Sequence, residues 1–469
     1  MTTRTSIPLG RWDIAVGGRR FAPWHHVTPP QLFVASFALL IVLGALGFAF
    51  LPGLYAGRPL SWTDCFFTSA SAVCITGLTV EDTATFFTPA GQVYLLLLIQ
   101  AGGLGLITFT SLIIVTLGRR LSLRQEALSG SGAEVAPQVS RQHLVRDVFR
   151  FTFAIEAVGA LVLYALWAPE MGWREAAWPA LFHAVSAFCN AGFSTFSDSM
   201  VPFQQAPATL AVIAGLVILG GLGFLTLEEL KLRRQAGKTK RIFRVSLHTR
   251  LVLATTVVLL LLGWVLYLLF EWYGVLHPLS LRDKISNSFF MSAMARSGGL
   301  HAVDYSHAHA NSLFLTILLM AIGGGPGSMA GGMKVTTFAL IGLLAWSRYR
   351  GRTVVGLWGR SVPPETVDRG VGVFVAVFGM ITLFILILST SELTGWARAR
   401  FLDCMFDAAS AFNTCGLSTG LTPELTPTGR WTSVVMMFLG RVGPLTFGAA
   451  LAQRRVRGLR YAYEDVVVG

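Results

Sequence analysis

Four short segments of this chain are near-copies of one another, and each stands next to a long apolar run. Every copy opens with Ser-Ala and contains a glycine with polar neighbours. The four copies are SAVCITGLTV from Ser71, SAFCNAGFST from Ser186, SAMARSGGLHA from Ser292 and SAFNTCGLST from Ser410. An internal repeat means that one structural unit is used several times. The sequence therefore predicts a fold built of four similar parts.

The shared glycine is unambiguous in three copies but not in the third. Gly77, Gly192 and Gly416 stand at the same distance from their serine, and a Leu or Phe follows each. That distance would select Gly298 in the third copy, whereas the leucine that follows favours Gly299. We align Gly299 with the other three.

Eight apolar runs place the chain in a membrane. Hydrophobic residues make up 53% of the chain and charged residues only 13%, against about 25% charged residues in soluble domains. Each run reaches or approaches the roughly 20 residues with which a helix crosses the hydrocarbon core. The runs are Gln31–Leu51, Gly91–Leu117, Val148–Trp167, Ala206–Leu227, Leu251–Phe270, Asn311–Trp346, Val371–Leu388 and Trp431–Leu451. We predict an all-α integral membrane protein with eight spans.

The basic residues are concentrated in alternate loops. The chain carries 37 Lys and Arg and a net charge of +13. Most of these residues precede span one, follow span eight, or lie in the loops after spans two, four and six. The positive-inside rule puts these loops and both termini in the cytoplasm. The pattern argues against a nucleic-acid partner, although some basic runs could also bind anionic membrane lipid or an acidic protein.

Each glycine segment lies on the external side and follows an amphipathic stretch too short to cross the membrane. The stretches are Trp62–Val73, Trp178–Phe188, Asp283–Ala295 and Phe401–Phe412. A half-helix that enters the membrane and returns by an extended segment fits this pattern, provided that the segment is buried in protein or lines a wet cavity. The even-numbered spans share a second pattern, namely GGLGLIT from Gly102, GGLGFLT from Gly220, GGPGSMA from Gly324 and GRVGPLT from Gly440.

The predicted unit is therefore helix, half-helix, glycine loop, helix, used four times around a central pore. We expect a cytoplasmic segment over 1–30, repeats over 31–118, 144–234, 249–349 and 369–454, and a cytoplasmic tail over 455–469.

Four such loops around one axis could coordinate a dehydrated cation through backbone carbonyls. Glycine adopts backbone angles that other residues avoid, which lets successive carbonyls point inward. None of the loop cores contains Asp or Glu, which favours carbonyl coordination over a carboxylate site for divalent ions. The alternative for any single loop is a glycine that lets helices approach closely. The candidate K⁺-coordinating residues are Ile75, Thr76, Gly77, Asn190, Ala191, Gly192, Ser297, Gly298, Gly299, Thr414, Cys415 and Gly416.

These motifs resemble the filter loops of the Trk/Ktr/HKT superfamily of cation transporters. SAVCITGLTVEDT, FHAVSAFCNAGFS, ARSGGLHAVDYS and SAFNTCGLSTGLTP match its four loops, and GGGPGSMAGGMKVTT and GRVGPLT match its inner helices. With eight spans, the chain resembles the bacterial Ktr B-type membrane subunit more than the Trk H-type. The third loop departs from the family by having Ser-Gly-Gly where Thr-Ala-Gly is more frequent.

The resemblance implies a function and partners. It implies K⁺ uptake through a gated, channel-like pore with a backbone-carbonyl selectivity filter, in a multi-pass protein of the bacterial cytoplasmic (inner) membrane. It implies a homodimer with one pore in each subunit. It also implies a cytosolic ring of RCK-type regulatory subunits that bind a nucleotide, ATP/ADP or NAD. The alternative is a Na⁺- or H⁺-coupled K⁺ symporter. No organic cofactor is expected in this chain.

Span six contains an unusual number of helix-breaking residues. Its glycines and Pro326 disfavour a continuous helix, so we expect a broken helix with a flexible loop under the filter. The resemblance makes this loop an intramembrane gate. The candidate gate residues are Gly323, Gly324, Gly325, Pro326, Gly327, Ser328, Gly331, Gly332, Lys334 and Arg441.

Three cations within or beside the spans need separate explanations. Arg441 lies inside span eight, where an ionisable residue is costly and usually functional; below a filter it would repel K⁺. The alternative for Arg441 is a structural bond to a buried carboxylate or to carbonyls. Lys334 is a second candidate for such a barrier, and the alternative is a side chain that extends to the cytoplasmic face. Arg296 is expected to brace the loops through carbonyls or a carboxylate.

An enzyme is the main rival class, and the sequence argues against it. We find no HExxH motif and no Cys/His zinc spacing. A proton-coupled transporter should carry acidic residues within its spans. Glu156, Glu228 and Glu229 are the nearest candidates, and we expect all three to be interfacial.

Overall fold

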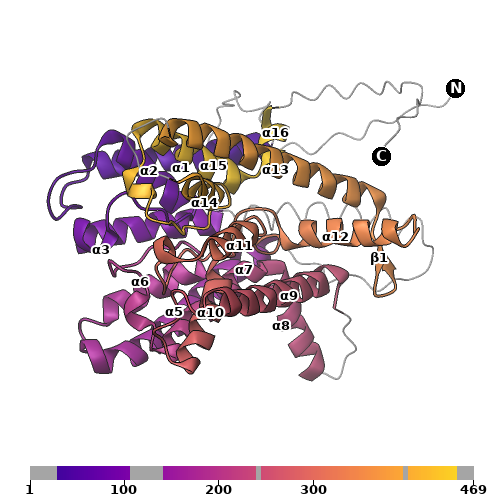
Figure 1. Ribbon diagram of the computed structural model, residues 1–469, viewed down its shortest axis with the longest axis horizontal. Helices are drawn as coiled ribbons and strands as arrows, with labels where there is room; N and C mark the ends of the chain where they lie inside the picture. Colours follow the sequence, from indigo (N-terminus) through magenta and orange to yellow (C-terminus); the bar gives the residue numbers. More distant parts are fainter. Residues whose placement is uncertain (1–28, 106–140, 239–244, 394–399, 452–469) are drawn as a thin grey trace, which may run out of the picture.

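The computed structural model describes residues 29–105, 141–238, 245–393 and 400–451. Apart from one two-stranded hairpin, the described residues form helices, turns and loops. The colours in Figure 1 follow the chain, and the first and last repeats lie side by side. Helix α1 (Pro29–Phe50) contacts both α15 (Pro427–Val442) and α16 (Pro444–Leu451) of the last repeat.

Every repeat contains a long helix followed by a short one. The long helices are α1, α5 (Arg141–Met171), α9 (Leu247–Phe270) and α13 (Pro364–Leu393). The short helices are α2 (Trp62–Val73), α6 (Ala177–Phe188), α10 (Leu281–Met294) and α14 (Phe401–Phe412). Within each repeat the long helix contacts the short one. The short helices coincide with the predicted half-helices to within two residues, because the amphipathic stretches were legible in the sequence.

The helices that follow the glycine loops differ from the uniform spans that the sequence suggested. In the first repeat, residues 89–105 are helical. In the second, α7 (Pro207–Leu222) and α8 (Phe224–Lys238) meet at an angle of 98°. In the third, α11 (Ala310–Met320) and α12 (Val335–Tyr349) are separated by residues 321–334, and in the fourth α15 and α16 are separated by Gly443.

The breaks in spans four and eight were not predicted, and both have the same backbone cause. Gly223 and Gly443 have φ angles of 87° and 84°, which a right-handed helix cannot accommodate. Pro444 follows the second break and has no backbone N–H to continue the helical hydrogen bonds.

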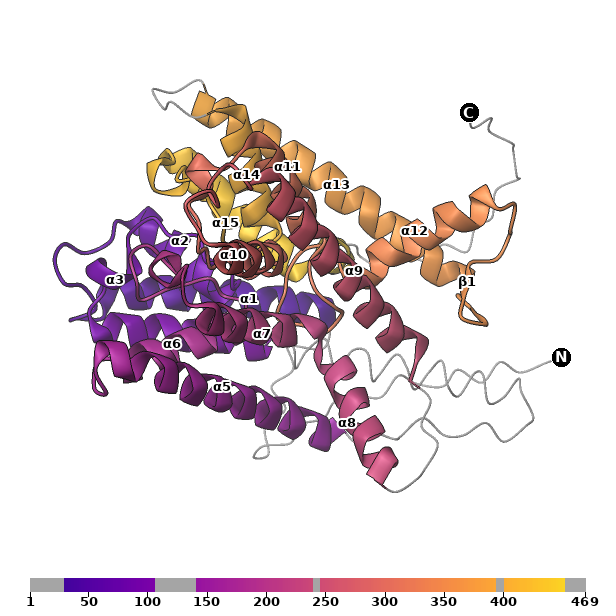
Figure 2. The same cartoon turned by 60° about the horizontal axis from the view of Figure 1, so that its bottom comes forward.

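Four described helices are long and apolar enough to cross a membrane, and the bent pair α7–α8 is a fifth candidate. The four are α1, α5, α9 and α13, the first span of each predicted repeat. The remaining predicted spans are bent, broken or only partly described. In Figure 2, α12 and the hairpin of β1 (Gly356–Leu357) and β2 (Arg360–Ser361) project to the right of the helices, and α8 projects downward.

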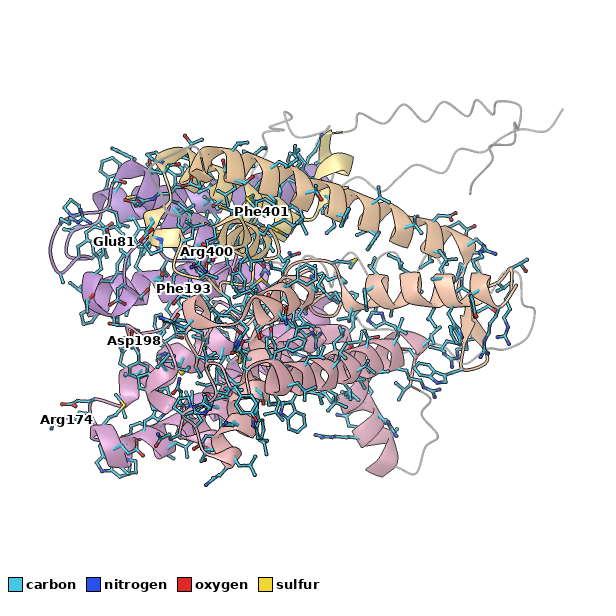
Figure 3. The ribbon with its side chains drawn as sticks, in the orientation of Figure 1. Glu81, Arg174, Phe193, Asp198, Arg400 and Phe401 are labelled. Atoms are coloured by element: carbon cyan, nitrogen blue, oxygen red, sulfur yellow. The ribbon has the colours of Figure 1, made fainter. Side chains whose placement is uncertain are left out.

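Short elements complete the outer loops. They are α3 (Thr83–Phe86) and the three single-turn helices η1 (Val201–Phe203), η2 (Tyr305–His307) and η3 (Thr422–Glu424). Phe193, labelled in Figure 3, lies in the interior just after the second glycine loop, whereas Arg174 lies at the outer edge of the bundle.

Candidate functional site

The four glycine loops share one uncommon backbone conformation. Each contains a triad, defined here as Ile75–Gly77, Asn190–Gly192, Ser297–Gly299 and Thr414–Gly416. The first residue of every triad has a positive φ, at 58°, 58°, 94° and 48°, and so does the closing glycine, at 91°, 74°, 70° and 94°. Positive φ is uncommon for a residue other than glycine. Its recurrence at equivalent positions shows that the sequence repeat is also a repeat of local structure, and it places Gly299, not Gly298, in register with the other glycines.

The four triads meet in a closed ring. A Cβ added to each glycine would meet backbone atoms of the next triad. On Gly77 it would meet the carbonyl oxygen of Ala191, on Gly192 the Cα of Gly299, on Gly299 the carbonyl oxygen of Cys415, and on Gly416 that of Thr76. The order one, two, three, four and back to one therefore closes the ring. Glycine is required at these positions because the backbones approach too closely for a side chain.

The serine that opens each segment braces its loop in three of the four repeats. Ser71 donates to the carbonyl of Leu78 at 2.7 Å and accepts from the N–H of Gly77 at 3.1 Å. Ser186 donates in the same way to Phe193 at 2.7 Å, and Ser410 accepts from the N–H of Gly416 at 3.0 Å. The brace accounts for the repeated serine in these three copies.

The third loop has a different brace. It is one residue longer than the others, because Arg296 stands between its short helix and its triad. Ser292 donates instead to the carbonyl of Leu260, at 2.8 Å. The extra residue explains why two glycines competed for alignment in the sequence.

The second shared pattern lets the inner helices contact the ends of the short helices. A Cβ on Gly102 would collide with the carbonyl of Val73, one on Gly220 with that of Phe188, and one on Gly440 with that of Phe412. In each case the carbonyl belongs to the last residue of α2, α6 or α14. Because these glycines have no side chain, each inner helix can lie directly against the end of the short helix that precedes its triad.

All four short helices end just before their triads. Their C-caps are Cys74, Cys189, Ala295 and Asn413. A helix C-terminus carries partial negative charge, so four of them directed at one ring favour a cation there. No group of three or more His, Cys, Asp or Glu among the described residues is placed to hold a metal ion.

Residues 321–334 form an ordered, hydrogen-bonded loop inside the bundle. Its two ends pair with each other: the N–H of Gly323 donates to Met333 at 2.9 Å, and that of Val335 donates to Gly324 at 3.0 Å. The predicted break in the helix is confirmed, and further backbone hydrogen bonds join the loop to α7. Such pairing is what permits irregular backbone at membrane depth.

The loop fills the break between α7 and α8. The N–H of Gly325 donates to Gly221 at 2.8 Å, that of Met329 to Gly220 at 3.1 Å, and the N–H of Phe224 donates to Gly327 at 3.1 Å. The same loop contacts the first repeat, since a Cβ on Gly103 would lie 3.0 Å from the sulfur of Met329. It therefore lies between the inner helices of several repeats.

Arg441 binds the middle of this loop. Its Nη1 donates to the carbonyl of Met329, and the residue is only 4% exposed. Its Nε and Nη2 have no hydrogen-bond partner among the described residues. Arg441 thus contacts a carbonyl. None of the salt bridges among the described residues pairs its charge with a carboxylate.

The other two cations also bind carbonyls. Lys334 donates to Ala330 at 2.6 Å, so its side chain turns back into the loop. Arg296 donates to Gly323 at 3.2 Å and to Thr256 at 3.4 Å, which agrees with the expected bracing through carbonyls.

Glu156 is not interfacial, contrary to our expectation. It is 3% exposed in the middle of α5, where it accepts from Gln100 at 3.1 Å and lies 3.7 Å from the sulfur of Cys189. It therefore lies behind the second triad. Sequence reasoning named Glu156 but did not reveal its burial, because its partner Gln100 comes from a different repeat.

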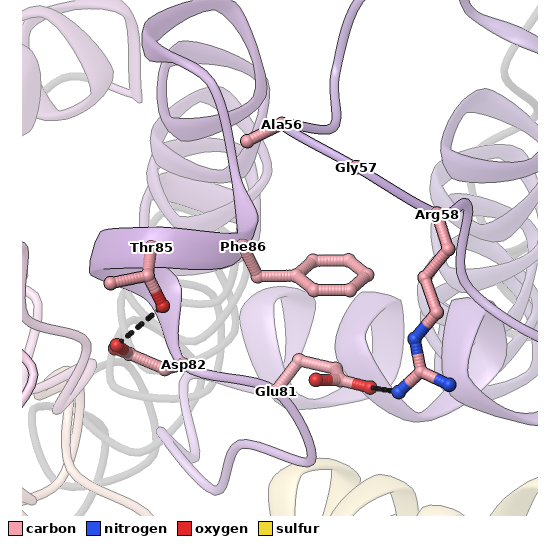
Figure 4. Close-up of a pocket in the computed structure, with 7 residues that line it drawn as sticks. All are labelled: Ala56, Gly57, Arg58, Glu81, Asp82, Thr85 and Phe86. Atoms are coloured by element: carbon pink, nitrogen blue, oxygen red, sulfur yellow. Dashed lines mark hydrogen bonds and ion pairs between the residues drawn. The ribbon is translucent and has the colours of Figure 1, made fainter.

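A pocket of about 370 Å³ opens among the outer loops of the first repeat (Figure 4). The ion pair of Arg58 and Glu81, with 2.7 Å between its charged atoms, lines it together with Asp82. Its lining includes no triad residue, so it is separate from the ring.

The helices define the class: this is a multi-pass membrane protein, in which four short helices each end at one ring of glycine-containing triads. Comparison with known proteins gives the family. The family model described as TrkH, a cation transport protein, matches residues 33–454. The chain belongs to this family of cation transport proteins.

Individual relatives cover almost the whole chain. It is 37% identical to the Ktr system potassium uptake protein B of Bacillus subtilis (strain 168), over 95% of this chain and 98% of the relative. It is 36% identical to the protein of that name from Vibrio alginolyticus, over 99% and 98%. The potassium/sodium uptake protein NtpJ of Enterococcus hirae is 32% identical over 94% and 98%.

A solved structure shares the fold. The crystal structure of the potassium transporter TrkH from Vibrio parahaemolyticus superposes with a TM-score of 0.71 at 21% identity, over 92% of this chain and 86% of that one.

Proposed function

We propose that this protein takes up K⁺ across the cytoplasmic membrane through a gated, channel-like pore. The observation that carries the proposal is the closed ring of four triads, which contain no acidic residue and which each follow the C-terminus of a short helix. Carbonyl rings replace the hydration shell of K⁺. The triads are then the selectivity filter, with K⁺ as the transported ion, and the proteins named above as potassium transporters support that choice.

The gate in this proposal is the loop of residues 321–334. It lies between the inner helices and contacts the third and fourth triads, so an ion leaving the ring toward the cytoplasm meets it. Arg441 adds an uncompensated positive charge at Met329. Loop and arginine together raise the barrier to K⁺, and displacing the loop opens the pore.

The proposed topology has eight spans with both termini in the cytoplasm. Each broken inner helix is one span, and the alternate basic loops orient the chain. We further propose a homodimer in the bacterial inner membrane, controlled by a cytosolic RCK-type ring that binds ATP/ADP or NAD. The support is the family resemblance and the naming of the relatives as parts of a Ktr system.

Ion-coupled symport is the second candidate. Two observations favour it: one relative is named a potassium/sodium uptake protein, and Glu156 is an acidic side chain buried within a span. An acidic residue at that depth suits proton or Na⁺ coupling.

Growth and uptake in cells that lack their own K⁺ uptake test the proposal. The protein should restore growth at low external K⁺ and take up Rb⁺, a K⁺ tracer, in preference to Na⁺. Equal Na⁺ and K⁺ uptake by a well-expressed protein would refute the assignment.

A further inference from the structure

The hydroxyl of Ser297 joins the loop of residues 321–334 to a different triad from its own. Its Oγ donates to the carbonyl of Thr414, the first residue of the fourth triad, at 2.9 Å. The same Oγ accepts from the N–H of Gly331 in the loop, at 3.3 Å. Ser297 is 2% exposed, so water does not compete for these bonds.

The direction of the two hydrogen bonds of Ser297 is fixed by the groups at their other ends. The amide of Gly331 can only donate and the carbonyl of Thr414 can only accept, so the hydroxyl must accept from one and donate to the other. A hydroxyl that accepts a hydrogen bond becomes a better donor. Removing Gly331 from Ser297 therefore weakens the bond on the Thr414 carbonyl.

The loop is packed against the fourth triad at the same place. A Cβ on Gly331 would collide with the side-chain oxygen of Thr414, and one on Gly332 would lie 2.9 Å from that of Asn413. At the other end of the loop, Arg296 binds the carbonyl of Gly323 at 3.2 Å. Two neighbouring residues of the third glycine loop thus hold both ends of the 321–334 loop.

No other triad has an equivalent bond among the described residues. The side chain of Ile75 is apolar, and the hydroxyl of Thr414 has no hydrogen-bond partner. The side-chain amide of Asn190, assigned so that its nitrogen faces acceptors, donates to carbonyls of its own repeat, at Val217, Phe188 and Ala187. The link between loop and ring is specific to the third repeat.

We propose that Ser297 is a positioning residue that couples the 321–334 loop to the Thr414 carbonyl, so that the state of the gate sets ion discrimination at the inner end of the filter. This inference rests on the proposed function. The Thr414 carbonyl has a second lone pair that can face the ion. The number and field strength of coordinating carbonyls govern K⁺ over Na⁺ preference, and the bond from Ser297 adjusts one of them.

A double-substitution experiment tests the coupling. Arg441→Ala releases the loop at Met329 without touching Ser297 or Thr414. The K⁺/Na⁺ permeability ratio, from reversal potentials of the full-length protein in liposomes, should fall roughly two- to tenfold in Arg441→Ala, the range that one net hydrogen bond can supply. The same substitution should leave the ratio unchanged in a Ser297→Ala or Ser297→Gly background.

Ser297→Gly controls for misfolding of Ser297→Ala, because glycine adopts the φ of 94° at this position without strain. Ser186→Ala is the matched control: it removes a brace from the second loop, at 2.7 Å from Phe193, and should retain the response to Arg441→Ala. An equal fall with and without the Ser297 hydroxyl, or no fall in its presence, would overturn the coupling but not the transport function. A native protein without K⁺ preference would instead overturn the proposed function.

Discussion

Nη1 of Arg441, in the last repeat, donates a hydrogen bond to the backbone carbonyl of Met329, in the middle of the loop that interrupts the third repeat. This bond joins the two features that the sequence marked as unusual within the membrane, a charged side chain and a glycine-rich break. The remaining guanidinium nitrogens have no hydrogen-bond partner among the described residues, so much of the charge stays available to act on an ion.

Arg441→Ala should increase K⁺ flux by about tenfold or more. Two unit charges 4 Å apart interact by about 4 kcal/mol at an effective dielectric constant of 20, so removing the cation can easily lower the barrier by the 1.4 kcal/mol that tenfold requires. Rb⁺ uptake per expressed molecule measures the change. Arg441→Lys keeps the charge and should stay near the native rate; unchanged or reduced flux in Arg441→Ala, with normal expression, contradicts the barrier role.

Gly77→Ser should bring the K⁺/Na⁺ permeability ratio close to one. A side chain at this position would collide with the carbonyl of Ala191 in the next triad, so the ring must rearrange. Competitive uptake of the two ions provides the measurement. Gly215→Ser is the control, because nothing lies within 4 Å of the Cβ position of this helical glycine in α7. If Gly77→Ser kept native selectivity, the first triad would not belong to the filter.

Gly440→Ala should destabilise the protein by about 1 to 3 kcal/mol, the usual cost of overpacking. The added methyl would collide with the carbonyl of Phe412 at the end of α14. Thermal unfolding in detergent should show a lower midpoint, whereas Gly448→Ala, with open space around its Cβ position, should not lower it. A native midpoint for Gly440→Ala would mean that α15 does not rest directly on α14.

Glu271 should stabilise the C-terminal end of α9 in a pH-dependent way. Its side chain is fully buried and accepts from the N–H of His309 at 2.9 Å and of Val275 at 3.1 Å. Burial by itself would raise the pKa of Glu271, but hydrogen bonding from Ser312, His309 and Val275 outweighs it and lowers the pKa below its usual value of 4.5. A lowered folded-state pKa gives stability that is present above the unfolded pKa and lost as the pH falls through the folded one.

The variant Glu271→Gln tests this prediction. At pH 7 it should lower the free energy of unfolding by about 1 to 3 kcal/mol, as expected for hydrogen bonds to a charged group. The difference in free energy of unfolding between this variant and the native protein should disappear as the pH falls below 4.5, the usual pKa of a glutamate, and through the lowered pKa of the folded state. A difference that is constant from pH 7 to pH 3 would show that the ionised carboxylate is not what stabilises this site.

The parts of this structure that were legible in the sequence are those that repeat. The closing glycines Gly77, Gly192 and Gly416 could be aligned because three copies share one length, and Gly299 could be placed by the residue after it. The half-helices followed from their amphipathic faces. Each of these signals lies within a short stretch of chain and does not depend on contacts with residues far away in the sequence.

The parts that the sequence did not reveal depend on contacts between repeats. At the sharp bend at Gly223, the 321–334 loop bonds to Phe224, a contact between two repeats. The bonds of Ser297 and Glu156 also join residues that are far apart in the chain. No periodicity or local motif encodes such pairs, so only the folded arrangement could show them.

The reversal potential of the purified protein in liposomes tests the central claim most directly. With a K⁺ gradient across the membrane, the current should reverse at the K⁺ equilibrium potential and stay there when Na⁺ or pH is changed on one side. A reversal potential that moves with the Na⁺ or proton gradient would contradict a K⁺-selective, channel-like pore that carries no second ion.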